Sequence, residues 1–332
     1  MALKAPRVDL QAWQDLKRHK FELEVARSAI RTWGFFELYN HNLPEATLES
    51  SFKACDEFFA LPQVEKLKSE SRLKQGSASL MRPGYCGDIL SRDGKRLPKE
   101  HYKSSRYVLN GDLLDEKFKP ENQAENVWPC HPADFKNSMN AVHEEFSRLA
   151  NTLLIEIFSE CLGIDSTCLR DKICAGDLIC KRFLNVNHCF KFSGRELLPA
   201  VPAHADPGAF TIVVQANKGV HGLQTLYHGE WVTIRPSKYS LIVNAGDCMK
   251  AWSNGLVQSM IHRVVNSSEG SRFSMAYFVS PPLDMVIEPI LELVTEENPA
   301  KYKPFKLLEL VRQDPETIRL DKFKISDEDS AR

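Results

Sequence analysis

The chain has 332 residues, of which 43% are hydrophobic and 26% are charged, and its formal net charge is −1. This composition is typical of a globular enzyme, and the near-zero charge argues against the strongly basic surface of a nucleic-acid-binding protein. No apolar run approaches the roughly eighteen residues that a membrane span needs, and the first residues lack the apolar core of a signal peptide.

The nine cysteines are an odd number and include no CxxC pair. Such a pattern indicates free thiols in a reducing compartment, because a disulfide framework or a zinc site would need paired spacings. We therefore expect a cytoplasmic enzyme with no nucleic-acid and no membrane partner, and we take a monomer as the default.

The first 70 residues read as a short strand followed by helices and one aromatic strand. In chain order we expect a strand at 7–10, a helix at about 17–33, a buried strand at 33–41, a helix at about 45–60 and a charged helical stretch at 63–70. The first helix is predicted from Phe21, Val25, Ala29 and Ile30, which recur at helical spacing. His41, at the end of the aromatic strand, is interpreted as a structural histidine.

Residues 71–128 are the least regular part of the sequence, because serine, glycine and proline alternate there with charges. A polar segment of this length inside a compact enzyme is usually a functional loop or a lid. A long helix follows at about 132–162, where apolar residues recur at three- and four-residue steps. We expect its apolar face to cover a sheet.

From residue 177 the sequence changes to short β-rich segments separated by Gly, Pro and Asn turns, which is typical of a jelly roll. The expected strands are 178–186, 210–215, 222–226, 231–234, 240–244, 262–265 and 272–279. Residues 283–325 are predicted to form a final helical segment. His188, upstream of the next motif, is left open as a residue near the site.

Two imidazoles and a carboxylate in this β-rich region suggest a metal site. His204 and Asp206 are two residues apart, so on a strand both side chains would leave the same face. His262 follows 56 residues later (262 − 206) and must come from a distant strand. Two histidines and one carboxylate form the facial set that holds non-haem Fe(II) and leaves coordination positions open.

Ten residues after His262 (272 − 262) stands Arg272, and Ser274 lies on the same face of the expected strand. A guanidinium fork binds carboxylates bidentately, and a nearby hydroxyl adds a donor. The pair therefore suits the distal carboxylate of a dicarboxylate.

The runs HADPGAFTIVVQ, GLQTL, GEWVTI, NAGD, WSNG, HRVVNSS and RFSMAYF resemble the 2-oxoglutarate- and Fe(II)-dependent dioxygenases. More narrowly, they resemble the isopenicillin-N-synthase-like branch, which includes many plant and fungal natural-product oxygenases. The WGFF…NH segment at 33–41 extends this resemblance to the N-terminal part. The resemblance implies an α+β fold, in which a double-stranded β-helix (jelly roll) core carries N-terminal and backing helices.

Three regions of one structural unit are expected on this basis. Residues 1–130 would form an N-terminal helical and strand region with a long substrate-side loop. Residues 131–282 would hold the backing helix and the jelly-roll catalytic core. Residues 283–332 would form a C-terminal helical segment that closes the barrel mouth.

The resemblance also implies the chemistry. Iron would be held by His204, Asp206 and His262, and 2-oxoglutarate would chelate it while Arg272 and Ser274 bind the distal carboxylate. O2 would be consumed, with ascorbate as a candidate reductant. A C–H bond of a small natural product would be oxidised by hydroxylation, desaturation or an oxidative rearrangement such as ring expansion, releasing succinate and CO2. Two alternatives stay open: an Fe(II) oxidase of the same fold that uses no 2-oxoglutarate, and a non-catalytic binding protein on the same scaffold.

The sequence departs from the branch on the strand before the metal pair. Many members carry there an Asn-x-Tyr that helps to orient the cosubstrate, but residues 182–187 contain no tyrosine. Either Leu184 and Val186 stand at the usual polar positions, or the register shifts so that Asn185 and Asn187 replace them.

Four residues are candidates for the substrate side of the site. Arg182 falls where related enzymes place a basic residue that faces the substrate, and Phe278 lies on the strand of Arg272. Arg82 and Tyr85 sit where related oxygenases often carry a glycine–aromatic stretch close to the substrate, although an ordinary surface turn is an equal interpretation.

Overall fold

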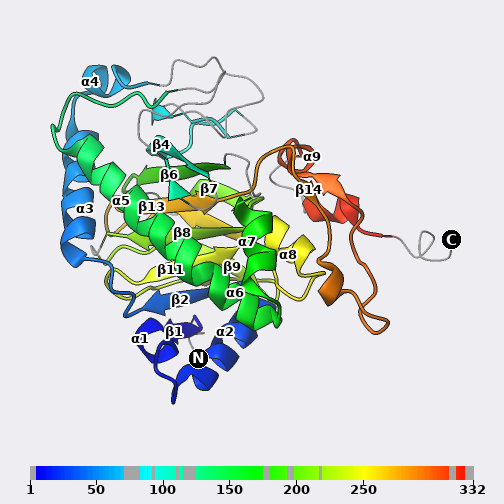
Figure 1. Ribbon diagram of the computed structural model, residues 1–332. Coiled ribbons are helices and arrows are strands. Elements are labelled where there is room, and N and C mark those ends of the chain that lie inside the picture. The colour runs from blue at the N-terminus through cyan, green and yellow to red at the C-terminus, as the bar shows by residue number, and fades with distance from the viewer. Residues whose placement is uncertain are drawn as a thin grey trace.

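The structure is a computed structural model that describes residues 5–70, 83–87, 89–91, 94–109, 112–114, 125–174, 180–192, 194, 198–216, 219–313 and 319–325. Its centre is a pair of β-sheets that together enclose one cavity, with helices on the outer face of the larger sheet (Figure 1). The expected α+β fold with a jelly-roll core is confirmed.

The larger sheet has nine strands in the order β1-β2-β11-β8-β13-β6-β4-β3, with β5 paired to β4. These strands are β1 (Arg7–Asp9), β2 (Phe35–Tyr39), β3 (Gly84–Cys86), β4 (Lys99–Leu109), β5 (Asp112–Leu113), β6 (Cys180–Cys189), β8 (Phe210–Gln215), β11 (Leu241–Ala245) and β13 (Arg272–Val279). Along β13 the side chains alternate between the cavity and the helices, as the two-residue period of a strand requires.

The smaller sheet has four strands in the order β10-β9-β12-β7. They are β7 (Pro199–His204), β9 (Leu223–Tyr227), β10 (Glu230–Thr233) and β12 (His262–Val265). In this sheet His262 of β12 lies directly opposite His204 of β7, so the strand pairing brings together two residues that are far apart in the sequence.

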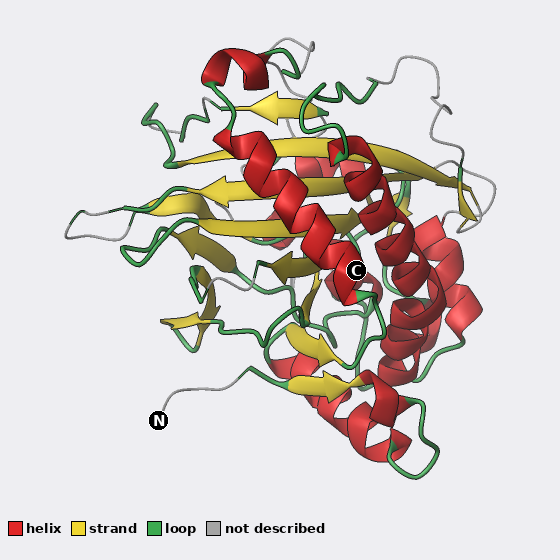
Figure 2. Cartoon of the chain, turned by 90° about the vertical axis from the view of Figure 1, so that its left-hand side faces the viewer, coloured by secondary structure: helices red, strands yellow, loops and turns green. Residues whose placement is uncertain are grey.

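The helices gather on one side of the larger sheet (Figure 2). They are α1 (Leu10–Trp13), α2 (His19–Thr32), α3 (Glu45–Ala60), α4 (Gln63–Leu67), α5 (Phe135–Leu149), a π-helical turn (Ala150–Leu154), α6 (Ile155–Leu162), α7 (Ser166–Cys174), α8 (Asp247–Trp252) and α9 (Leu307–Val311). In the part of the chain that the structure describes, none of these helices has the length and apolar character that crossing a membrane requires.

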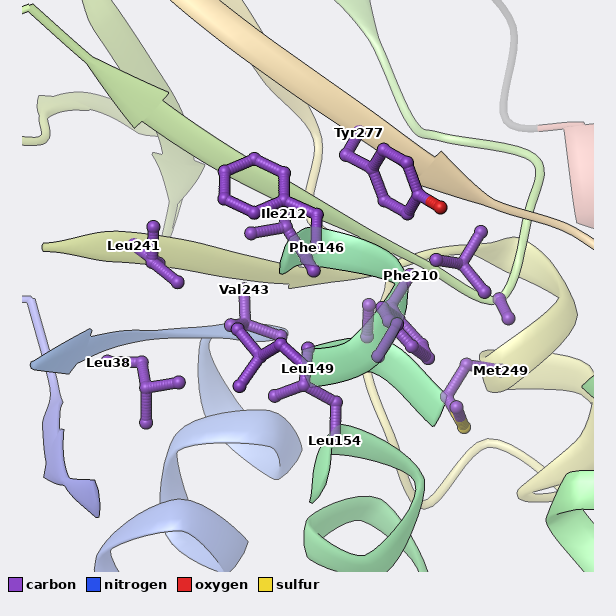
Figure 3. Close-up of a cluster of buried hydrophobic side chains, with 14 of the residues drawn as sticks. Leu38, Phe146, Leu149, Leu154, Phe210, Ile212, Leu241, Val243, Met249 and Tyr277 are labelled. Carbon is purple, nitrogen blue, oxygen red and sulfur yellow. The ribbon is translucent and has the colours of Figure 1, made fainter. Parts of the chain in front are cut away.

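The main hydrophobic core lies between the helices α5 and α6 and the larger sheet (Figure 3). Phe146 of α5 packs edge-on against Tyr277 of β13, and Phe158 of α6 stacks on Phe210 of β8. The predicted apolar face of the long helix is therefore the face that covers the sheet. This layer holds the opposite, cavity-facing side of β6, β8 and β13 in place.

Replacing Phe146 by alanine is expected to lower the free energy of unfolding by about 3–5 kcal/mol, because a fully buried ring leaves a cavity that the surrounding side chains fill only in part. Chemical denaturation of the purified variant measures this. The matched change Phe21→Ala, at a ring that is 68% exposed, should cost far less. Equal losses in the two variants would contradict the assignment of this core.

The helix predicted at about 17–33 forms as α2, although Phe21, one of the residues that predict it, is exposed. Two expectations about secondary structure were wrong. Residues 71–128 were read as a loop, yet they contain the eleven-residue strand β4 next to β6. Residues 283–325 were expected to be helical.

The described part of that last segment holds two short 3-10 turns (Leu291–Leu293 and Arg319–Phe323), α9 and the two-stranded ladder of β14 (Val286–Ile287) and β15 (Phe305–Lys306). It lies beside α8 (Figure 1) and supplies none of the side chains that line the cavity. Closure of the barrel mouth by residues 283–332 therefore stays a prediction.

Candidate active site

Three potential metal ligands converge at the edge of the smaller sheet. His204 and His262 face each other across the β7–β12 pair, and Asp206 follows two residues after the end of β7. The ligand atoms of these three side chains all lie within 4.8 Å of one another. The pair of His204 and Asp206 was expected on one strand face, but β7 ends at His204 and the turn that follows carries the carboxylate inwards.

Backbone carbonyls orient both imidazoles. The Nδ1 of His204 lies 2.9 Å from the carbonyl oxygen of Pro202, and the Nδ1 of His262 lies 3.1 Å from that of Met260. A ring nitrogen beside a carbonyl must donate, so the proton sits on Nδ1 and Nε2 keeps its lone pair. The two Nε2 atoms lie 3.6 Å and 4.0 Å from Oδ1 of Asp206.

Asp206 is held through its other oxygen. The Thr211 hydroxyl donates to Oδ2 at 2.7 Å and the Asn244 amide donates to the same atom at 2.8 Å, which leaves Oδ1 facing the histidines. Burial raises the pKa of the Asp206 carboxyl, but His262, His204 and the Thr211 hydroxyl hold it well below its usual range. Burial lowers the pKa of His262 to about 4. At neutral pH the set therefore offers the Asp206 carboxylate and the neutral imidazole of His262, with the His204 ring beside them.

This donor set fits Fe(II). Two neutral nitrogens and one carboxylate oxygen on one side of an ion are the facial arrangement of non-haem iron, and each ligand has an outer partner that fixes its direction. Sequence reasoning missed Thr211 and Asn244. The NAGD run that contains Asn244 was noted for its resemblance only, and the pairing of β11 with β8 that brings it to Asp206 is not visible in the sequence.

Replacing Asn244 by alanine is expected to weaken iron binding by about 10- to 100-fold, since partners of metal ligands typically contribute that much. Metal titration of the variant, followed by iron retained after dialysis, measures the change. Asn254→Ala serves as the matched control, because Asn254 is also buried but bonds backbone carbonyls of Asn298 and Pro299 away from the cavity. Unchanged iron affinity in Asn244→Ala would contradict the role of this amide.

The metal set opens into a cavity of about 110 Å³ between the two sheets. Its walls differ in character: the smaller sheet supplies mainly aliphatic side chains, and the larger sheet supplies polar and charged ones. The lining residues are Lys99, Asn185, Asn187, Val201, His204, Asp206, Thr211, Val213, Leu223, Ile242, Asn244, Met260, His262, Val264, Arg272, Ser274, Ala276 and Phe278.

Arg272 and Ser274 lie on the cavity face of β13, and both are buried. The Arg272 Nη1 donates to the Ser274 hydroxyl oxygen at 2.9 Å, and Nε donates to the Gln215 side-chain oxygen at 3.3 Å. In the described ranges no carboxylate forms an ion pair with this guanidinium. Burial lowers the pKa of Arg272, yet an arginine stays charged, so the cavity holds a cation suited to an anionic ligand.

The structure decides between the two registers considered for β6. Asn185 and Asn187 line the cavity, whereas Leu184 and Val186 are buried in the core under the helices. The register with the two asparagines is therefore correct, and Asn187 lies opposite Ser274 in the β6–β13 ladder.

Phe278 lines the cavity, as expected, but Arg182 does not. Arg182 shares its face of β6 with Leu184 and Val186, is 0% exposed, and donates from Nη1 to the backbone oxygen of Ser280 at 2.8 Å. The prediction that it faces the substrate was wrong, because one step along a strand turns a side chain to the other face.

Tyr85 also lies away from the cavity. Its hydroxyl donates to Glu100 at 2.5 Å, and the same carboxylate receives Lys66 and His188, each at 2.8 Å. This buried polar cluster lies on the helix side of β4 and β6, so Tyr85 and His188 both have structural partners instead of a place at the site. Arg82 lies outside the described residues.

The fold and the site together define a non-haem iron oxygenase with a jelly-roll core. The family model of the 2OG-Fe(II) oxygenase superfamily matches residues 182–281, and that of the non-haem dioxygenase N-terminal region, described as "in morphine synthesis", matches residues 5–131. The chain belongs to the 2-oxoglutarate- and Fe(II)-dependent oxygenase family.

Individual relatives agree with this assignment. Jasmonate-induced oxygenase 4 of Arabidopsis thaliana is 32% identical over 88% of this chain and 78% of its own length. Flavanone 3-dioxygenase 2 of Oryza sativa subsp. japonica is 31% identical over 83% of this chain and 75% of its own length. The crystal structure of JOX2 in complex with 2OG, Fe and JA superposes with a TM-score of 0.80 at 25% identity, covering 98% of this chain and 90% of that one.

The chain is therefore an oxidoreductase that uses Fe(II), 2-oxoglutarate and O2 to oxidise a small molecule. The alternative of an oxidase that does not use 2-oxoglutarate is not favoured by these relatives.

Proposed function

We propose that this oxygenase oxidises a C–H bond of a small natural product at an iron held by His204, Asp206 and His262, with the distal carboxylate of 2-oxoglutarate on Arg272 and Ser274. One observation carries the proposal. A cavity between the two sheets holds three converging ligand atoms at one place, and its larger-sheet wall carries a buried arginine that forms no ion pair among the described residues.

The two groups lie at different depths along the larger sheet. Asp206 is bonded to Thr211, which pairs with Phe278 near the end of β13, whereas Arg272 lies at the beginning of the same strand. A dicarboxylate that chelates the metal through one end would reach Arg272 with the other. The aliphatic side chains of Val201, Leu223 and Val264 form the opposite wall and would pack against its methylene groups.

When bound, iron and 2-oxoglutarate supply the activation of O2 and the oxidising power for C–H cleavage, with succinate and CO2 as coproducts. The chain contributes position and environment. The backbone carbonyls of Pro202 and Met260 keep both Nε2 atoms directed at the metal position, and the Thr211 and Asn244 donors keep Asp206 ionised. The buried walls keep bulk water from the reacting atoms.

The substrate is expected next to Phe278, an aromatic side chain that lines the cavity. Phe278 lies opposite Thr211 in the β13–β8 pairing, and Thr211 bonds the metal ligand Asp206. An aromatic face of this kind suits a ring or an alkyl chain. One relative is named for a flavanone and the JOX2 structure is a complex with JA, which supports a small natural product as substrate without selecting one.

The test is succinate release by the purified Fe(II) enzyme with 2-oxoglutarate, in air, against a panel of jasmonate-like acids, flavanones and related phenolics. The proposal expects at least one compound to raise succinate formation above the substrate-free rate and to gain or lose mass by oxidation. If the iron-loaded wild type forms no more succinate than His262→Ala does, the proposal is contradicted.

Reducing surroundings form part of the proposal. All nine cysteines are free thiols, and eight of them are buried or half-buried. This supports a cytoplasmic location. The monomeric state, the absence of nucleic-acid and membrane partners and the division at 1–130, 131–282 and 283–332 stay predictions.

A further inference from the structure

A second buried cation lines the cavity, and the proposed function does not use it. Lys99, the first residue of β4, is only 8% exposed. Its Nζ has one long contact, 3.4 Å to the side-chain oxygen of Asn187, and no ion pair with any carboxylate of the described chain. Burial lowers the pKa of Lys99, which means that the surroundings do not compensate its charge. An uncompensated buried cation is costly, so a site that retains one is suited to an anion.

The strand pairing places Lys99 at the depth of Arg272. Arg272 of β13 is opposite Cys189 of β6, and Cys189 is opposite Lys99 of β4, so the three residues form one row across three strands. Neighbouring strands are about 4.8 Å apart, which puts the backbones of the two cations roughly 10 Å apart. Both side chains line the cavity, and the Nζ of Lys99 reaches Asn187 of β6.

The contact of Lys99 with Asn187 shows where the Nζ of Lys99 lies relative to Arg272 and Ser274. Asn187 is the ladder neighbour of Ser274, the hydroxyl that receives Arg272. The Nζ of Lys99 therefore lies beside the Arg272–Ser274 pair and not beside the metal ligands, which lie deeper along the sheet. Arg272, Ser274, Asn187 and Lys99 together form a cluster of donors on one wall.

We propose that Lys99 is a cosubstrate-specificity residue: with Asn187, it binds the distal carboxylate of 2-oxoglutarate from the β4–β6 side of the donor cluster, next to Arg272 and Ser274 of β13. This rests on the proposed function, which assigns the Arg272 end of the cavity to that carboxylate.

The proposal has a consequence for selectivity. Two cations on one carboxylate make that group the main determinant of recognition, because charge-assisted hydrogen bonds are stronger than neutral ones. A 2-oxo acid of similar length that lacks the second carboxylate, such as 2-oxobutanoate, gains nothing from Lys99. A site built to pair an anion discriminates strongly against analogues that leave the cations unpaired.

The experiment is an anaerobic binding titration of the Fe(II)-loaded protein without primary substrate, followed by the weak visible absorption of the chelated 2-oxo acid. Wild type, Lys99→Met, Arg272→Met and Lys103→Met are each titrated with 2-oxoglutarate and with 2-oxobutanoate. Lys103 is the matched control, since it lies on the same face of β4 but does not line the cavity. Lys99→Met removes a buried charge without removing volume, so the fold should persist, and a thermal melt checks this.

Lys99→Met is expected to weaken 2-oxoglutarate binding roughly 10- to 100-fold, as for the loss of a hydrogen bond to a charged group, and to leave 2-oxobutanoate binding unchanged. Lys103→Met should bind both acids like the wild type, and Lys99→Arg should recover part of the lost affinity.

Three results would overturn the inference. If Lys99→Met binds 2-oxoglutarate as tightly as the wild type while Arg272→Met loses much affinity, Arg272 binds the cosubstrate and Lys99 does not. If Lys99→Met keeps its 2-oxoglutarate affinity but has a raised KM for the primary substrate, Lys99 binds a carboxylate of that substrate instead. Equal losses for both acids indicate a structural effect. If Arg272→Met also binds 2-oxoglutarate normally, the proposed cosubstrate site itself fails.

Discussion

His262→Ala is expected to lose iron binding and to reduce succinate formation to background while keeping the fold. The imidazole is one of three converging ligands, and two remaining ligands leave the ion without its facial set. Its removal takes the Nδ1 donor away from the Met260 carbonyl oxygen, a single backbone acceptor, so the protein should still fold. Iron content after anaerobic loading and the succinate assay measure both effects, and circular dichroism checks the fold.

His228→Asn is the control for this change. His228 lies in the exposed turn between β9 and β10 with a φ of 48°, a backbone conformation that asparagine tolerates. It should bind iron and turn over like the wild type. Iron bound by His262→Ala at wild-type affinity would contradict the assignment of this histidine as a ligand.

Arg272→Met is expected to weaken 2-oxoglutarate binding by about 100-fold or more, with iron affinity unchanged. The guanidinium is buried, already aligned by Ser274 and Gln215, and would form charge-assisted bonds to a carboxylate in a site with little water. The dissociation constant from the anaerobic titration and the KM for 2-oxoglutarate report this loss separately from the chemical step.

Arg27→Met, which changes an arginine on α2 that bonds backbone oxygens of α6, is the matched control and should leave both constants unchanged. Should Arg272→Met instead lose iron with its cosubstrate affinity intact, the arginine would act on the metal set and not on the distal carboxylate.

The metal set could be found in the sequence because its residue types are rare in this combination and the flanking runs resemble a known family. The residues that orient the metal ligand Asp206 could not be found in the sequence. Thr211 and Asn244 reach Asp206 only through the pairing of β8 with β11, and nothing in a single sequence marks which polar side chains will meet. The local reason given for the His204–Asp206 spacing was also incomplete, since a turn and not a strand carries Asp206.

The strand β4 was missed because several of its buried positions are polar or charged. Residues 99–109 alternate between the two faces of the sheet, but Glu100 and Ser104 occupy the helix side and Lys99 the cavity side, so the hydrophobic periodicity is interrupted. Glu100 forms an ion pair there with Lys66 and a hydrogen bond with His188, and Ser104 bonds His143. Tertiary partners thus outweigh the local pattern. Because the strand was not predicted, Lys99 was not recognised as a cavity residue.

Arg182 shows the sensitivity of strand register. The resemblance placed it near the substrate, and a shift of one residue moves it from the cavity to the core side of β6. The asparagines at 185 and 187 were recognised as one of two alternatives, and only the observed ladder with β13 could choose between them.

The central claim is that one cavity holds iron on His204, Asp206 and His262 and 2-oxoglutarate on Arg272. Anaerobic titration of the Fe(II)-loaded wild type with 2-oxoglutarate tests it most directly, through the weak visible charge-transfer band of the chelated cosubstrate. We expect a saturable band that is absent in His262→Ala and needs far more 2-oxoglutarate in Arg272→Met. A protein that binds iron but develops no band at any concentration of 2-oxoglutarate would contradict the account.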